Sequence, residues 1–192
     1  SLVYLDFNDK KVIQKNAEYT LANVNQNIDL VITNAIYQQD LMTVNPSLVV
    51  SLWRLLTRDS IDYADYIFLN SMRTILSSIA ESHPYIDSTY LYLDGYDNFL
   101  SSHDGVSTVY GYYDNAWYDT YRNADPEVNQ WIESRNVRKY AHSQNTDVIT
   151  IYQRMTYMHG VIIVNILADQ LEDILNLLIT DPDEKFYLLN AD

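Results

Sequence analysis

A length of 192 residues allows one large domain or one and a half small ones. The composition, with 47% hydrophobic and 20% charged residues, is that of an ordinary globular protein. The chain has 12 basic and 26 acidic residues and a formal net charge of −14, which disfavours nucleic acid or an anionic membrane surface as a partner, because both require clustered Lys and Arg. It contains no cysteine, which excludes thiol catalysis, thiolate metal sites and disulfides.

The first long segment, from Asp9 to Met42, contains neither Pro nor Gly. Its apolar residues recur mostly three or four positions apart, which predicts an amphipathic helix about 50 Å long if it is continuous. The predicted apolar stripe consists of Leu21, Val24, Ile28, Val31, Ala35 and Met42. Such a helix is longer than one small domain covers, so we expect a homodimer contact through this segment, residues 1–44. Alternatively the helix breaks near Asn25 or Asn27 and packs on its own domain.

Two further helices are expected before the first strand. Asn45 and Pro46 form a helix start signal, and the helix that follows runs from Ser47 to about 57. The next helix is capped by residue 59 or 60 and runs to about Glu81. It ends at His83-Pro84, because the residue before proline is pushed out of the helical region.

The pattern then changes to short extended runs. Residues 88–93 and 98–102 are expected to form a hairpin around the turn residues 94–97, and residues 103–105 form the next turn. Residues 109–121 follow, with six aromatic residues among thirteen and Asp and Asn between them. This composition predicts a turn and short helix that either line a small-molecule pocket or pack partly on the sheet as a Tyr-rich loop.

The last third reads as strands followed by a helix. A helical turn is expected at 126–130 and a strand or mixed segment at 131–140, where Arg135, Arg138 and Lys139 form a basic patch. Residues 148–155 and 161–166 predict two strands, the second apolar enough to be central, and residues 168–179 predict a helix. The longest apolar run, 160–164, is far shorter than the roughly 18 residues of a membrane span.

This order of elements resembles the Cache family of extracytoplasmic sensor domains, which have a PAS-like fold. The hairpin from Tyr90 to Gly95, the pair Trp117-Tyr118 and the strand 160–166 carry the resemblance, over roughly residues 10 to 180. It implies an α+β fold: a PAS-like antiparallel sheet with a long N-terminal helix and additional helices. Residues 45–180 would be the sensor module. Residues 186–192 echo the hairpin, so 181–192 would begin a second module.

The amino-acid-binding branch of that family has a sharper motif, which this chain matches in part. Tyr110 and Trp117-Tyr118 match it, whereas its Arg falls on Asn115 and its Asp on Asn165. An Arg binds a ligand carboxylate and an Asp pairs with an ammonium, so two neutral amides lack the charges that an α-amino acid needs. We therefore expect a neutral ligand, such as a sugar, rather than an α-amino acid.

The resemblance and the aromatic segment together select the candidate ligand-binding residues. Only one of Tyr90 and Tyr92 is expected to face the pocket, since neighbouring positions on a strand point to opposite faces. The candidates are Tyr110, Tyr112, Asn115, Trp117, Tyr118 and Asn165, followed by Tyr92, Tyr152 and Arg154.

No pattern for catalysis is found. The four histidines have no zinc-ligand spacing, and neither a nucleophile elbow nor a phosphate-binding glycine loop occurs. A cation held by Asp94, Asp97 and Asp104 is the one metal alternative, and it lacks the distal Glu of a calcium loop. We expect no enzyme activity, no catalytic residue and no cofactor, since no Cys or suitably placed His is present for flavin attachment or haem ligation.

The resulting prediction is a small-molecule sensor domain of a bacterial transmembrane receptor, either a sensor histidine kinase or a membrane-bound transcriptional regulator. The resemblance implies an extracytoplasmic location, with attachment to the membrane through segments outside this chain. The alternative is a ligand-free dimerisation and signal-relay module, whose pocket would be filled by its own Tyr side chains.

Overall fold

The structure is a computed structural model, and it describes residues 63–81, 84–138, 143–155 and 158–170, residue 173 and single residues between 15 and 54. Its elements are α3 (Tyr63–Glu81), β1 (Ile86–Leu93), β2 (Asn98–Ser101), β3 (Gly105–Thr108), α4 (Ala116–Asn123), β4 (Gln130–Arg138), β5 (Asn145–Arg154) and β6 (Gly160–Leu167). The described residues between 15 and 37 are helical, as are those between 50 and 54. The apolar stripe of the predicted long helix and the segment 186–192 lie outside the described residues.

The six strands form one antiparallel sheet in the order β3-β2-β1-β6-β5-β4. This confirms the α+β class and the antiparallel sheet. It also confirms β6 as a central strand, consistent with an apolar sequence whose residues from Val161 to Ile166 are all buried. The hairpin of β1 and β2 is confirmed too, and its turn contains Gly95 at φ 86°, a conformation that favours glycine.

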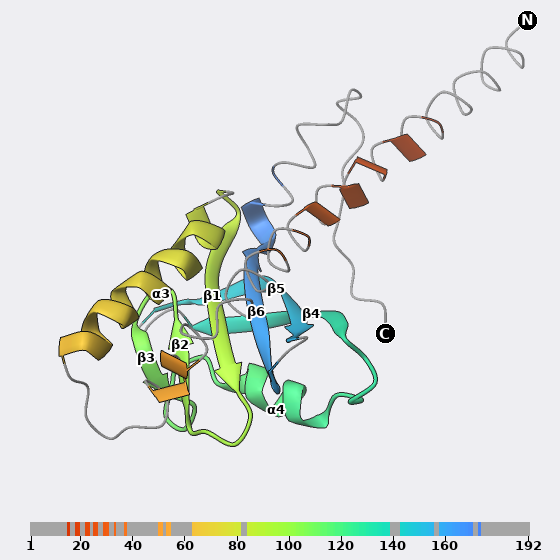
Figure 1. The fold of residues 1–192 in the computed structure, drawn as a ribbon. Helices are drawn as coiled ribbons and strands as arrows, with labels where there is room; N and C mark the ends of the chain where they lie inside the picture. Colours follow the sequence, from red (N-terminus) through yellow and green to blue (C-terminus); the bar gives the residue numbers. More distant parts are fainter. Residues whose placement is uncertain are drawn as a thin grey trace, which may run out of the picture.

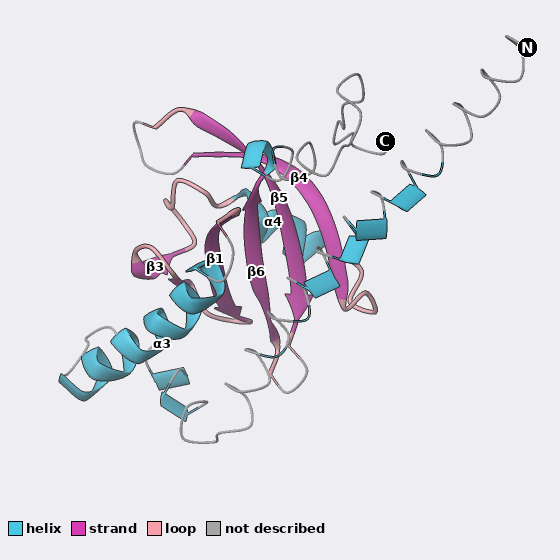
Figure 2. Cartoon of the chain, turned by 90° about the horizontal axis from the view of Figure 1, so that it is seen from above, coloured by secondary structure: helices cyan, strands magenta, loops and turns pink. Residues whose placement is uncertain are grey.

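The two described helices of full length lie on opposite faces of the sheet (Figures 1 and 2). On one face, Met72 and Leu76 of α3 pack against alternate residues of β1 and β6, among them Leu91 and Ile162. The three- and four-residue spacing of the α3 apolar residues places them on that face. The other face carries α4 and an aromatic cluster, and this face holds the candidate site.

Three local predictions differ from the structure. Residues 105–108 form the edge strand β3, which is only four residues long and has a sequence, Gly-Val-Ser-Thr, with little apolar signal. The predicted helical turn at 126–130 is a turn closed by the Val128 N–H and the Asp125 carbonyl, and β4 begins at Gln130. The strand β5 begins at Asn145, three residues before the predicted start, because its first residues pair with β4.

Candidate functional site

A row of polar residues crosses the α4 face of the sheet. Ser88 of β1 lies opposite Asn165 of β6, Asn165 lies opposite Thr150 of β5, and Thr150 lies opposite Glu133 of β4. The Asn165 Nδ2 donates to Ser88 Oγ at 3.0 Å, and Thr150 Oγ1 donates to Asn165 Oδ1 at 2.8 Å. Ser88 shares this face with Tyr90 because residues two apart on a strand point the same way. A shift in register between Ile86 and Ser88 turns Ile86 to the other face, where it packs in the α3 core.

An ion pair lies on this row. Arg135 of β4 donates from Nη1 to Asp114 Oδ1 at 2.7 Å and from Nη2 to Asp114 Oδ2 at 3.2 Å. The guanidinium also donates to Thr150 Oγ1 and to Asn165 Oδ1, both at 2.8 Å. The Tyr90 hydroxyl donates to Asp114 Oδ2 at 2.9 Å. The two charged side chains are only 5% and 2% exposed, so this is a buried, hydrogen-bonded charge pair.

Burial and the partner charges set the protonation of this site. Burial by itself lowers the pKa of Arg135, but its hydrogen bonds and charge attraction to Asp114 outweigh burial and raise it. Burial, reinforced by the Asp114 charge, raises the pKa of Tyr90 well above its ordinary value. Arg135 therefore stays cationic and Tyr90 keeps the proton that it donates.

An aromatic cluster adjoins the polar row. The Trp117 ring of α4 is fully buried, and its centroid lies 5.6 Å from that of Tyr92, 5.2 Å from that of Phe99 and 6.0 Å from that of Tyr90. On β5, Tyr152 stacks on Trp131 at 4.8 Å. The buried Trp117 indole N–H has no hydrogen-bond partner within the described part of the chain. Buried N–H groups are seldom left unpaired, so this donor is a candidate for contact with a ligand.

The structure brings some of the candidate residues together and leaves others apart. Four of them are buried on the α4 face and two are half-buried beside them: Tyr92, Trp117, Tyr152 and Asn165, then Tyr112 and Tyr118. Tyr110 is 65% exposed, and Asn115 is exposed at the start of α4 without a side-chain cap bond. The Arg154 guanidinium stacks over Tyr121 and donates to the Val128 carbonyl. These three lie at the margin of the site.

The expectation that only one of Tyr90 and Tyr92 faces the site is wrong. Both rings contact Trp117 on the α4 face. Residues two apart on a strand share a face, and only immediate neighbours alternate. Tyr90 therefore belongs to the candidate site, and its hydroxyl is the link between the aromatic cluster and the ion pair.

The sequence analysis missed the residues of the ion pair. Arg135 is not part of an exposed basic patch, because its side chain is buried and bonded to Asp114, whereas Arg138 is exposed. The premise of the neutral-ligand argument therefore does not hold, since the site contains one positive and one negative charge beside Asn165. A local signal for the network exists: Thr150 is a polar residue within the apolar run of β5, between Ile149 and Ile151.

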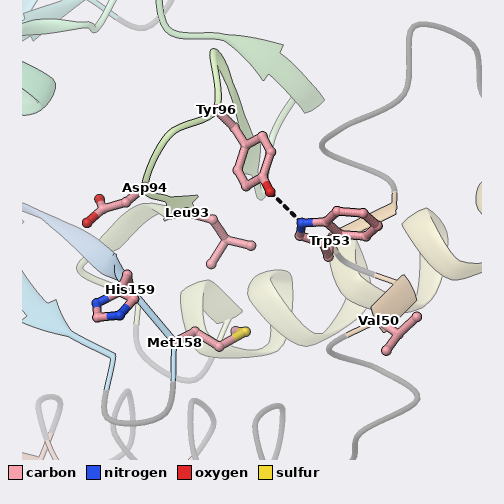
Figure 3. A pocket seen from close by; sticks show the side chains of 7 residues that line it. All are labelled: Val50, Trp53, Leu93, Asp94, Tyr96, Met158 and His159. Carbon is pink, nitrogen blue, oxygen red and sulfur yellow. Dashed lines mark hydrogen bonds between the residues drawn. The ribbon is translucent and has the colours of Figure 1, made fainter.

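A separate pocket of about 320 Å³ lies where β1 ends and β6 begins (Figure 3). It is lined mainly by apolar and aromatic side chains, and the Trp53 indole N–H is already bonded to the Tyr96 hydroxyl. Of its lining, only Asp94 was a candidate from the sequence, as a ligand of the cation alternative. The lining residues are Val50, Trp53, Leu93, Asp94, Tyr96, Met158 and His159.

The described residues contain no group of three or more His, Asp or Glu side chains that could hold a metal ion. Two of the three aspartates of the cation alternative have different partners: Asp94 accepts from the Tyr121 hydroxyl, and Asp104 accepts from the hydroxyls of Tyr112 and Tyr113. Within the same residues, no helix is long and apolar enough to cross a membrane.

Comparison with known proteins gave matches only among solved structures, since no protein-family model and no curated protein matches the chain. The ligand-binding domain of the Campylobacter jejuni chemoreceptor Tlp3, solved with L-norvaline, is 17% identical at a TM-score of 0.40, with 81% of this chain and 62% of that chain covered. A structure of the same sensory domain with isoleucine bound has 15% identity, a TM-score of 0.40 and coverage of 83% and 65%.

The extracellular domain of a proposed histidine kinase, soHK1S-Z6, is 16% identical at a TM-score of 0.40, with 84% of this chain and 66% of that chain covered. The chain thus spans less than two thirds of the length of these domains.

Proposed function

We propose that the chain is the ligand-sensing domain of a bacterial transmembrane receptor, a sensor histidine kinase or a membrane-bound transcriptional regulator, and that it acts outside the cytoplasm. The observation that carries this proposal is the buried network of Arg135, Asp114, Thr150 and Asn165 on the α4 face. Buried charge pairs contribute little to stability compared with apolar side chains of the same volume. Such a network is therefore better explained by recognition than by packing.

The composition of this face suits a small molecule. The half-buried rings of Tyr112 and Tyr118 offer flat apolar contact area beside the buried cluster, and the polar row offers donors and acceptors that fix orientation. The unpaired Trp117 indole N–H supplies one further donor among the described residues. The neutral ligand expected from the two amides loses its premise at this charged site, so sugars are tested beside carboxylates and amino acids.

Signalling would follow from a shift in population. A ligand that binds one arrangement of the loop 109–115, α4 and the sheet better than another favours that arrangement. Because Asn165 belongs to β6, a change at the site acts on the strand that leads directly into the helical residues 168–170. We expect β6 and the segment after it to transmit the signal towards the membrane.

A second function has a specific observation in its favour. Tyr92 and Tyr152 are fully buried among the protein's own side chains, and Arg135 is already bonded to Asp114. This is the self-filled site that a ligand-free relay module predicts. In that case the network would only hold α4 and its loop on the sheet, and dimerisation would carry the signal.

A thermal-shift screen of the purified chain against amino acids, carboxylates, amines and sugars separates the two functions. A ligand at about 100 times its dissociation constant stabilises the protein by roughly 2.7 kcal/mol, a shift of several degrees. We expect such a hit, with at least about tenfold weaker binding to Trp117→Phe, which keeps an apolar ring and removes the indole N–H. An exposed control, Tyr63→Phe, should bind normally. No response across the panel would favour the relay module.

The homodimer and the membrane attachment belong to the same proposal. Sedimentation velocity over a concentration series is expected to show a dimer that becomes a monomer when Val24 and Val31, on the predicted apolar stripe, are replaced by Glu. A concentration-independent monomer for the unmodified chain would contradict the dimer contact through residues 1–44.

A further inference from the structure

Asp114 and Arg135 come from parts of the chain that differ in their attachment to the fold. Arg135 lies on β4, where residues 130–138 pair continuously with β5. Asp114 lies in the loop between β3 and α4, where Gly111 has φ 93°. The loop begins at Val109, whose N–H donates to the Asp97 carbonyl, and the Asp114 side chain reaches from it into the buried face.

The sheet positions the guanidinium by itself. Arg135 Nε donates to Thr150 of β5, and Nη2 donates to Asn165 of β6, which is itself held by Ser88 of β1. These bonds join four neighbouring strands of one sheet and involve no residue of the loop. The cation is therefore oriented whether or not Asp114 is bonded to it.

The donors that hold the Asp114 carboxylate would recognise any carboxylate. Two parallel N–H groups of one guanidinium match its two oxygens, and the Tyr90 hydroxyl donates to one of them. This forked geometry is the usual way in which arginine binds carboxylates. These donors bind a planar anion, and nothing in their arrangement requires the anion to be part of the protein.

Charge balance then restricts the class of ligand. A neutral ligand that displaced Asp114 would leave the buried guanidinium without its close counter-charge, since Glu133 lies farther away, 3.7 Å from Nε. A ligand carboxylate would replace one anion by another and keep the pair neutral. The Trp117 N–H, unpaired within the described residues and beside Tyr90, adds a donor on the same face.

We propose that Asp114 is an internal occupant of the ligand site, and that the ligand carries a carboxylate that displaces Asp114 from Arg135. This inference rests on the proposed sensing function and names its ligand class. Displacement frees the Asp114 end of the loop 109–115 from Arg135, while Val109 and Tyr112 still hold its first part, so occupancy of the anion site is coupled to the position of the segment that leads into α4. Because Asp114 competes with the ligand, the apparent affinity is the intrinsic affinity multiplied by the fraction of molecules in which the site is free.

Chemical rescue tests the anion site without knowledge of the natural ligand. The variant Asp114→Ala is titrated with formate and acetate, with sodium chloride at equal ionic strength as the reference. We expect a saturable rise in the melting temperature of about 5–10 °C at a hundred times the dissociation constant. The unmodified chain, the exposed-carboxylate control Asp119→Ala and the double variant Asp114→Ala/Arg135→Met should show no such response.

A second variant covers the case in which Asp114→Ala does not fold even in formate. Asp114→Asn keeps the size of the side chain and removes its charge, so carboxylate hits from the screen should bind it at least about tenfold more tightly than the unmodified chain. Equal affinities, or an Asp114→Ala protein that folds and ignores formate and acetate, would overturn the proposal. If the unmodified chain still bound a ligand from the screen, the sensing function would stand and only the anion site would be lost.

Discussion

The energy of the buried ion pair can be measured with a double-mutant cycle on Asp114 and Arg135. In Asp114→Ala the guanidinium keeps its bonds to Thr150 and Asn165 but loses its counter-charge. In Arg135→Met the carboxylate keeps only the Tyr90 hydroxyl among the partners described above. Breaking a pair with both side chains 5% exposed or less leaves an uncompensated buried charge, at a cost of about 3–5 kcal/mol.

The double variant removes both charges together. Thr150 and Asn165 can still bond each other, and Asn165 can still bond Ser88, so no buried charge remains at the pair. The double variant should lose about 3–5 kcal/mol of unfolding free energy, which is less than the sum of the losses in the two single variants. The difference is the coupling energy, which we expect to be about 3 kcal/mol. In a chain of 192 residues each single variant should melt about 6–20 °C lower.

Urea unfolding followed by circular dichroism measures the four proteins of the cycle. The slope of the unfolding free energy against urea must be the same in all of them for the midpoints to be compared. Arg138→Met is the matched control, since Arg138 is exposed on the same strand, and it should change stability by less than about 0.5 kcal/mol. A coupling energy below about 0.5 kcal/mol would refute the description of Asp114 and Arg135 as a mutually dependent pair.

Two other predictions concern the packing of the same sheet. A Cβ at Gly160 would lie 2.2 Å from the backbone carbonyl oxygen of Tyr92. We therefore expect Gly160→Ala to destabilise the protein by about 2–4 kcal/mol in the same urea assay. An effect below about 0.5 kcal/mol would contradict that contact. The second prediction is alkaline unfolding. Burial raises the pKa of Tyr90 and Tyr152 above the ordinary value of 10.0, so the folded state holds protons that the unfolded state releases. This stabilisation is complete below pH 10 and is lost as the pH rises further, so part of the tyrosinate absorbance should appear only together with the loss of near-UV circular dichroism. Ionisation of all 18 tyrosines with the fold intact would contradict the burial of these phenols.

Much of the fold could be predicted from local patterns. The spacing of Phe68, Met72 and Ile75 and the proline at 84 are enough to place α3 and its end, because helix periodicity and termination depend on near neighbours. The apolar run from Val161 to Ile166 predicts a central strand for the same reason. Aromatic side chains between Tyr110 and Tyr121 predicted a segment that covers a surface, and Trp117 fills that role.

The site itself was decided by the tertiary structure. Asp114 and Arg135 are 21 residues apart, and no local pattern distinguishes a buried arginine with a partner from an exposed one. Ser88, Asn165 and Thr150 lie in one row only because the register of three strands aligns them. The sequence by itself determined most of the described strands and helices, with β3 as the exception. Strand pairing and burial decided which polar residues meet, because their energies depend on partners that are distant along the chain.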